Sequence, residues 1–404
     1  MKKVNSLGLG SLMSGLTSNL TIGPISASFS SLIAASILVI AVPTTVRAAD
    51  ETVLKIGVMG PETGAQAAVG KDDENGVRLA VDRVNAQKIM IDGKPLRLDL
   101  TAADDAADPR TGVTVAQMMI DQGVKVVFGP YNSGVAMATS KMFDSAGIIN
   151  ANVASNPQVT AQGFKYVFRL AASDAQIGPR MAEVAATKLK LKRIAIIDDR
   201  TAYGQGVADA FAAAATADGI QVVDREYTTD SAIDFGAVLT KMKQAKPEAI
   251  FFGGYYGQAG SLIKQMARLG MDQPLLGGDG MCVQDTANLA GPAANGKVYC
   301  PQGGPLLEGS KSGQAFKTEY VNRFKIAPLT YSSALYDGVM LLSAAIKGTN
   351  SVDPAKLRDA LQQSDMDGVA GHYSFDDNRD LKHSPITIYT IKDGKLTQLA
   401  GAQQ

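Results

Sequence analysis

The sequence predicts an α/β fold made of two parallel-sheet lobes. Short apolar segments alternate with segments of helical periodicity, the alternation restarts after Arg169, and no low-complexity linker separates the halves. Continuous apolar strands between amphipathic helices are typical of parallel sheets covered on both faces. A chain of 404 residues suffices for two such domains. The missing linker favours several chain crossings and a hinged cleft.

Periodicity places each element along the chain. In the segment 70–87, Val77, Val81 and Val84 fall on one helical face. Strands are expected at 53–58, 95–100, 124–128, 147–151, 193–197, 220–226, 248–252 and 274–276, with a last strand at 386–391 that closes the chain. Helices are expected at 70–87, 111–121, 133–146, 176–190, 204–217, 234–244, 257–269, 311–325, 331–347 and 354–362.

Composition and motifs argue against several functions. The 39 basic and 39 acidic residues give a formal net charge of +0, and no basic run marks a nucleic-acid surface. The two histidines, His372 and His383, lie beside no plausible nucleophile and are expected at the surface. The sequence has no HExxH, P-loop or CxxC motif. We therefore expect a protein that is not an enzyme and holds no cofactor and no metal.

Residues 1–48 are expected to form a signal peptide. This segment begins with two lysines after Met1, contains no acid and holds an apolar run at 32–42. Small residues at Val46 and Ala48 suit a cleavage site. A membrane anchor is the alternative, but the run is shorter than the ~20 residues of a spanning helix. With no cysteine near that site for a lipid anchor, we expect a protein secreted to the periplasm.

Cys282 and Cys300 are the only cysteines in the sequence. In an oxidising compartment an isolated pair most simply forms one disulfide. A metal site is the alternative, but it needs further ligands and both histidines lie far along the chain. The disulfide is therefore favoured.

Polar residues follow the predicted strands of the first half. Ligands of open α/β sheets bind beyond the carboxyl ends of the strands. Ser133 begins a predicted helix, whose free N–H groups and hydroxyl suit a carboxylate. Further on, Val153 precedes Ser155, whose hydroxyl can donate to a carboxylate or accept from an ammonium. The structural alternatives are a helix cap at Ser133 and an ordinary turn before Pro157.

The second half supplies aromatic and acidic residues at matching places. Tyr203 precedes a helix and is able to wall off a ligand. Two glycines before Tyr255 permit close approach, although their spacing is not that of a dinucleotide fingerprint. Asp279, followed by Gly280, is a suitable partner for an ammonium group. Packing aromatics and a tight-turn aspartate are the structural alternatives.

Asp104, Asp105 and Asp108 form an acidic group after the second long strand. Their spacing is not that of an EF-hand loop. We expect a solvated loop there rather than a calcium site.

These loops resemble the periplasmic leucine/isoleucine/valine-binding protein family of bacterial ABC importers over about residues 51–395. The order and spacing of the matching segments are more specific than any one of them. The matching segments are 56–61 with 63–64, 104–105 with 108–109, 127–130 with Ser133, 154–157, 203–206, 252–255 and 277–280.

The resemblance implies a type I periplasmic-binding-protein fold with two doubly wound lobes joined by a three-crossing hinge. The crossings are expected near residues 169–171, 300–302 and 382–384. Lobe 1 is then 49–170 plus 301–383, and lobe 2 is 171–300 plus 384–404.

The resemblance also implies a role for each candidate residue. Ser133 matches a carboxylate-binding serine, and Ser155 stands where the family has a threonine that contacts the zwitterion. Asp279 matches the acid that pairs with the α-ammonium, while Tyr203 and Tyr255 match aromatics that close over the ligand. The predicted site comprises Ser133, Val153, Ser155, Tyr203, Tyr255, Asp279 and Gly280.

Two departures from the family pattern bear on specificity. Val69 stands where close relatives carry an aromatic residue, which alters the side-chain pocket, and Asp279 is one methylene shorter than glutamate. The expected function is a monomeric binding component of an ABC importer that delivers an α-amino acid, first of all a branched-chain one, to a membrane permease. The alternative is a sensory or regulatory module for an amide or a small carboxylate.

Overall fold

Two large β-sheets organise residues 51–401, the part of the chain that the computed structural model describes. The first sheet has the strand order β2-β3-β1-β4-β5-β6, and only the pairing of β2 with β3 is antiparallel. Its strands are β1 (Thr52–Gly60), β2 (Met90–Ile91), β3 (Lys94–Asp104), β4 (Val126–Phe128), β5 (Ile149–Asn152) and β6 (Val167–Arg169).

The second sheet has the order β15-β14-β11-β10-β9-β7-β8. Its pairings from β8 to β11 are parallel, whereas β14 and β15 are antiparallel to their neighbours. Its strands are β7 (Arg193–Asp198), β8 (Gln221–Tyr227), β9 (Ala249–Gly253), β10 (Leu275–Gly277), β11 (Val298–Gly303), β14 (Ile386–Lys392) and β15 (Lys395–Gln398). The two strands β12 (Asp365–Asp367) and β13 (His372–Ser374) form a separate pair.

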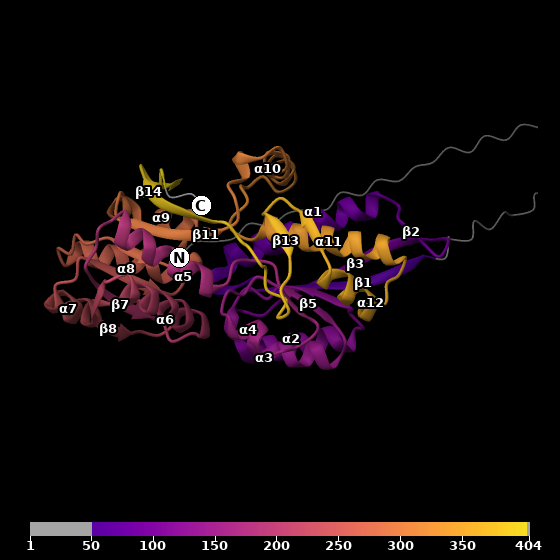
Figure 1. Ribbon diagram of the computed structural model, residues 1–404, viewed down its shortest axis with the longest axis horizontal. Helices are drawn as coiled ribbons and strands as arrows, with labels where there is room; N and C mark the ends of the chain where they lie inside the picture. The colour runs from indigo at the N-terminus through magenta and orange to yellow at the C-terminus, as the bar shows by residue number, and fades with distance from the viewer. Residues whose placement is uncertain (1–50, 402–404) are drawn as a thin grey trace, which may run out of the picture. The chain divides into compact units, whose positions relative to one another are not determined.

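Helices accompany each sheet, as Figure 1 shows, and together they define the two lobes. The first lobe holds α1 (Ala67–Ala86), α2 (Pro109–Asp121), α3 (Ser133–Ser145), α4 (Gln158–Ala161), α10 (Lys311–Phe324), α11 (Ser332–Thr349) and α12 (Pro354–Gln362). The second lobe holds α5 (Asp174–Thr187), α6 (Ala202–Ala217), α7 (Gly236–Ala245), α8 (Tyr256–Arg268) and α9 (Gln284–Ala290).

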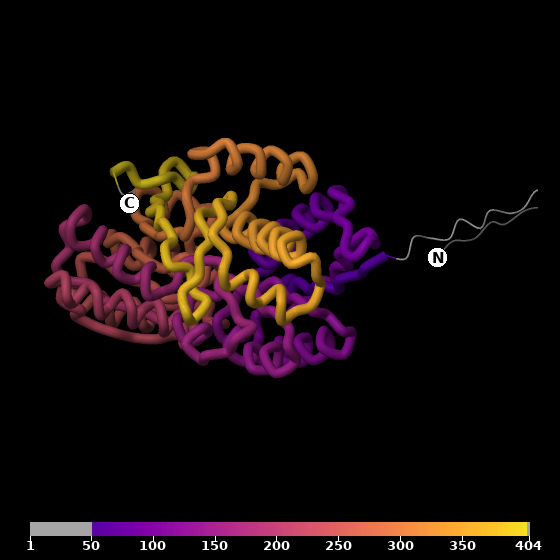
Figure 2. Tube along the Cα trace, turned by 45° about the vertical axis from the view of Figure 1, so that its right-hand side comes forward, coloured from indigo at the N-terminus to yellow at the C-terminus, as the bar shows by residue number. Residues whose placement is uncertain are grey.

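The chain passes between the lobes three times. It leaves the first sheet after β6, returns to the first lobe after β11 as α11 packs against α1, and re-enters the second sheet at β14. Figure 2 shows the yellow C-terminal segment beside the orange part of the chain, in agreement with the β11–β14 pairing. The predicted lobe limit at 300/301 falls inside β11, where Pro301 still pairs with Ile388. The exact lobe limits stay a prediction.

Several predicted helices begin where the sequence supplies a cap. The side chains of Asp108, Ser173 and Thr201 each accept a hydrogen bond from a backbone N–H in the first turn of α2, α5 and α6. Such caps satisfy N–H groups that have no partner inside the helix. The caps and the apolar strands are both local signals in the sequence. The observed helix starts therefore lie within a few residues of the predicted ones.

The prediction that the strand at 386–391 closes the chain was wrong. A further strand, β15, pairs antiparallel with β14. The turn between them is Asp393-Gly394, with positive φ angles of 51° and 72°. Asp-Gly is a strong hairpin signal because both turn residues need positive φ. This signal was present in the sequence and predicts the hairpin.

The acidic loop after β3 is exposed at Asp108, as expected of a solvated loop, but not at Asp105. Asp105 is 0% exposed. Its Oδ1 accepts a hydrogen bond from Ala107 N at 2.9 Å, while Oδ2 has no hydrogen-bond partner among the described residues. Burial, together with nearby carboxylates such as Asp104, raises the pKa of Asp105 to about 7.

The raised pKa predicts a pH-dependent effect of Asp105→Asn. A carboxyl whose folded-state pKa is raised contributes stability below its unfolded pKa of about 3.9, and this is lost as the pH rises through about 7. The amide does not titrate, so the free energy of unfolding of the variant should rise relative to that of the wild type by roughly 3–4 kcal/mol between pH 4 and pH 8, at about 1.4 kcal/mol for each pKa unit. Urea unfolding at both pH values measures this. If the difference in unfolding free energy between variant and wild type is the same at both pH values, the prediction is wrong. It is also wrong if the exposed control Asp82→Asn shows the same change with pH.

Candidate functional site

Ser133 lies at the start of α3, just beyond the carboxyl end of β4. The connecting residue Gly129 has φ +86°, and a Cβ there would lie 2.1 Å from Met59 O, so only glycine fits. Ser133 is buried, and its Oγ accepts a hydrogen bond from Asn156 N at 3.3 Å. The helix cap is Asn132, not Ser133. The alternative of a capping role for Ser133 is therefore wrong.

Val153 and Ser155 lie in the loop that follows β5, and both are buried. The carbonyl oxygen of Ser155 accepts a hydrogen bond from Asp174 N at 2.8 Å. The Ser155 hydroxyl lies close enough to the Asp174 carboxyl to lower its pKa. This hydrogen bond therefore joins the loop of the first lobe to the start of α5 in the second lobe.

Three predicted residues of the second lobe form one hydrogen-bonded group. Tyr203 OH donates to Asp279 Oδ1 at 2.8 Å and accepts from Gly280 N at 2.7 Å. A Cβ on Gly280 would lie 2.8 Å from the Tyr203 ring. The glycine thus permits the close approach of the Tyr203 ring. The Tyr255 ring packs beside Tyr203 at a centroid distance of 4.9 Å.

Two tyrosines of the first lobe complete this group, and sequence reasoning missed both. The Tyr131 ring lies 5.7 Å from the Tyr255 ring and 5.7 Å from the Tyr331 ring. Tyr331, which precedes α11, donates its hydroxyl hydrogen to Asp279 Oδ2. Tyr131 stands two residues before Ser133, after a strand, which was an available signal. Nothing local in the sequence marks Tyr331.

Asp174 is a second carboxylate in the same place, and it was also missed. It is the first residue of α5 and is 0% exposed. Neither carboxylate oxygen has a hydrogen-bond partner within the described part of the chain. Burial and the charge of Asp279 raise the pKa of Asp174 well above its usual value, outweighing Ser155 and Arg169. Burial likewise raises the pKa of Asp279, against its hydrogen bonds to Tyr331 and Tyr203.

The two lobes contact each other directly around these residues. Asn156 Nδ2 in the first lobe donates to Ala202 O in the second at 2.7 Å. A Cβ on Gly206 of α6 would lie 2.4 Å from Asn156 Nδ2 and 3.5 Å from Asp174 Oδ2. With Tyr331 bonded to Asp279, these contacts describe a closed cleft that buries every predicted site residue.

The predicted disulfide is confirmed. Cys282 and Cys300 are bonded across 18 residues of sequence. Cys282 N donates to Asp279 O at 2.8 Å, so the bridge begins at the turn that holds the candidate acid. It joins that turn to β11.

Other candidates from the sequence lie elsewhere. His372 and His383 are exposed, as predicted. Val69 is buried in α1. Within residues 51–401, no group of three or more His, Cys, Asp or Glu side chains is arranged to hold a metal ion.

The arrangement suits a zwitterion. A hydroxyl and free backbone N–H groups at the start of α3 suit an anion. Two buried carboxylates with tyrosine hydroxyls suit a cation, since buried charge needs a charged or hydrogen-bonding partner. Both lobes supply these groups. The arrangement therefore suits the binding and enclosure of a small ligand.

Comparison with family models matches residues 53–395 to the family described as periplasmic binding protein. The chain belongs to the periplasmic binding protein family. The predicted fold class and family are thereby confirmed, and the chain is placed among substrate-binding proteins of transporters, not among enzymes.

This periplasmic binding protein has relatives of similar length. It is 33% identical over 350 residues to a Pseudomonas aeruginosa amino acid binding protein, covering 85% of this chain and 92% of the relative. LivJ of Streptococcus pneumoniae, solved with isoleucine, is 27% identical with a TM-score of 0.78, covering 87% and 100% of the two chains. A Rhodopseudomonas palustris solute-binding protein, solved with 3,4-dihydroxybenzoic acid, is 26% identical with a TM-score of 0.77, covering 87% and 97%.

In the described part of this periplasmic binding protein, no helix has both the length and the apolarity needed to cross a membrane. The predicted signal peptide, residues 1–48, lies outside the described residues.

Proposed function

We propose that this protein is the periplasmic binding component of an ABC importer and that it binds an α-amino acid between its lobes. The observation that carries the proposal is the pair of buried carboxylates, Asp174 and Asp279, which interact electrostatically, with Ser155 beside Asp174. Two buried carboxylates repel each other unless a cation or a proton lies between them. The α-ammonium of an amino acid supplies that cation, while the carboxylate of the same ligand reaches the start of α3 at Ser133.

The same observation favours an amino acid over an aromatic acid. A benzoate-like ligand brings a third carboxylate and no cation to Asp174 and Asp279. That combination is unfavourable in a buried site. The names of the Pseudomonas aeruginosa relative and the isoleucine complex point the same way. A branched-chain amino acid is the first candidate.

In this proposal Ser133, Val153 and Ser155 receive the ligand in the first lobe. Tyr203, Tyr255, Asp279 and Gly280 complete the site when the lobes close. Because the ligand groups are divided between lobes, the ligand interacts more strongly with the closed form and shifts the population toward it. The closed form then presents both lobes to the permease.

We also propose where the protein acts and which partners it meets. A signal peptide at residues 1–48 directs the chain to the periplasm, where a cleaved monomer without a lipid anchor meets the permease subunits. The oxidised Cys282–Cys300 pair is consistent with that compartment.

Isothermal titration with a panel of α-amino acids, their N-acetyl derivatives and benzoic acids tests the ligand class. The wild type should bind at least one α-amino acid and not its N-acetyl form, which lacks the ammonium. Asp174→Asn should weaken binding by about tenfold or more, since one charged partner is lost. The exposed control Asp209→Asn should bind normally.

Binding of benzoic acids but not of any amino acid would contradict the proposal. An amide or small-carboxylate ligand would then become the candidate. Equal binding of an amino acid and its N-acetyl derivative would show that the protein does not recognise the α-ammonium.

A further inference from the structure

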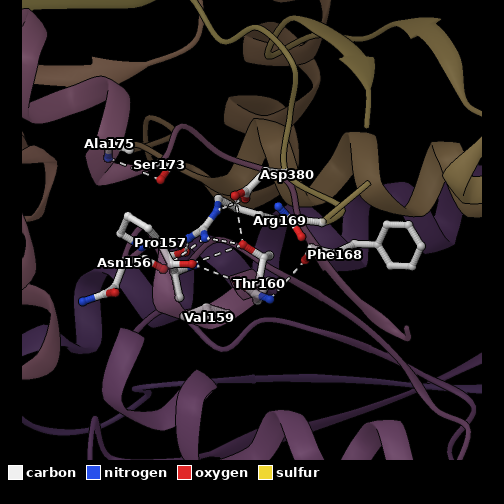
Figure 3. Close-up of polar contacts among 12 residues, drawn as sticks. Asn156, Pro157, Val159, Thr160, Phe168, Arg169, Ser173, Ala175 and Asp380 are labelled. Carbon is white, nitrogen blue, oxygen red and sulfur yellow. Dashed lines mark hydrogen bonds and ion pairs between the residues drawn. The ribbon is translucent and has the colours of Figure 1, made fainter. Parts of the chain in front are cut away.

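A buried arginine lies directly behind the loop that carries Ser155. Arg169 ends β6, and its side chain is 0% exposed. Figure 3 shows its guanidinium among Asn156, Thr160 and Asp380. Nε donates to Asp380 Oδ1, and Nη2 donates to Thr160 Oγ1 at 3.0 Å. Thr160 Oγ1 donates in turn to Asp380 Oδ2 at 2.9 Å, which closes a ring of three side chains.

The remaining guanidinium bonds go to backbone carbonyls on either side of Ser155. Nη1 of Arg169 donates to Ala154 O, and Nη2 donates to Asn156 O at 3.0 Å. The planar guanidinium holds several donors in a fixed geometry. The Ala154 carbonyl belongs to the peptide unit before Ser155 and the Asn156 carbonyl to the one after Asn156, so the guanidinium holds the loop on both sides of Ser155. The direction of the Ser155 hydroxyl therefore depends on Arg169.

The same loop contacts two other parts of the candidate site. Asn156 N donates to Ser133 Oγ, and Asn156 Nδ2 donates to Ala202 O, the neighbour of Tyr203. A displacement of the loop consequently moves groups of both lobes.

Arg169 also joins two segments that lead into the hinge. It lies at the end of β6, just before the first passage between the lobes. Its backbone N donates to Arg379 O at 3.0 Å. Asp380 lies between β13 and β14, ahead of the third passage. The ring of side chains thus connects the loop at 153–156 with two of the three passages.

We propose that Arg169, Thr160 and Asp380 are positioning residues for the loop at 153–156, acting on the ligand through Ser155. This inference rests on the proposed function. Stability alone does not account for the arrangement, because a buried ion pair is often no more stabilising than apolar side chains of the same volume. Two guanidinium bonds end on the backbone of this one loop, which points to orientation as its role.

Thr160→Val is the sharpest test because it removes one hydroxyl from the ring and keeps the side-chain shape. The titrated ligand is the α-amino acid that the wild type binds best. We expect about tenfold weaker binding, as for one lost hydrogen bond to a charged group. Asp380→Asn, which retains an acceptor for Arg169, should have a smaller effect. Thr139→Val is the matched control, since Thr139 is equally buried but bonds only its own helix.

A double-mutant cycle separates positioning from a general loss of structure. If Thr160 acts through Ser155, then Thr160→Val should cost less than about twofold in a Ser155→Ala background. The same loss in both backgrounds, or wild-type affinity of Thr160→Val and Asp380→Asn, would overturn the inference. Failure of the wild type to bind any α-amino acid would instead overturn the proposed function, and the inference with it.

Discussion

Replacing Asp279 by alanine is expected to weaken amino-acid binding by about 30-fold or more, because truncating one partner of a buried charge pair costs about 2–5 kcal/mol. The carboxylate is 3% exposed and accepts hydrogen bonds from Tyr203 and Tyr331. Without it the ligand ammonium keeps only Asp174 as a charged partner. Isothermal titration with the best-bound amino acid measures the loss.

Two variants control this prediction. Asp279→Asn retains a carbonyl oxygen and should bind more tightly than Asp279→Ala. Asp272→Ala removes a highly exposed acid of the same lobe and should leave affinity unchanged. Wild-type affinity of Asp279→Ala would show that the ammonium site lies elsewhere.

The stability of Asp279→Ala needs a separate measurement. Asp279 is not a loop acid outside the core, because it is buried in a short helical turn. Its loss leaves two buried tyrosine hydroxyls without their acceptor, which costs about 1–3 kcal/mol each. Removing a buried carboxylate whose pKa is raised by burial offsets part of that cost. Thermal unfolding should therefore show a folded protein with a modest shift.

Reducing the Cys282–Cys300 disulfide is expected to lower the free energy of unfolding by about 3 kcal/mol, the chain-entropy contribution of a loop of this length. The cross-link restricts the unfolded chain, whereas both sulfurs stay buried in the folded one. Urea unfolding of oxidised and reduced wild type makes the comparison with no change of side chain. The reduced protein should also show the larger m-value, since its unfolded state exposes more surface.

Free-thiol titration of the denatured, unreduced protein should find no thiol. The double variant Cys282→Ala/Cys300→Ala should match the reduced wild type, apart from the small cavity that it leaves. If the oxidised and reduced proteins unfold at the same urea concentration, the bridge does not restrict the unfolded chain as expected.

Sequence alone determined the layered α/β architecture and singled out most residues of the candidate site. Apolar strands such as β4 and β9 and caps such as Ser173 are local signals, because burial on both faces and unpaired helix N–H groups act on neighbouring residues. Residues directly after strands, among them Ser133 and Asp279, were found because parallel strands bring their carboxyl ends to one edge.

Tertiary structure alone decided which distant residues meet at the site. Asp174, Tyr331 and Arg169 have no local feature that separates them from ordinary helix or strand residues, and they acquire a role through contacts across 50 or more residues, as from Tyr331 to Asp279 and from Arg169 to Asp380. Burial between the lobes leaves the Asp174 oxygens without hydrogen-bond partners among the described residues. Burial and cross-lobe pairing depend on how the whole chain packs, so periodicity and residue type do not specify them.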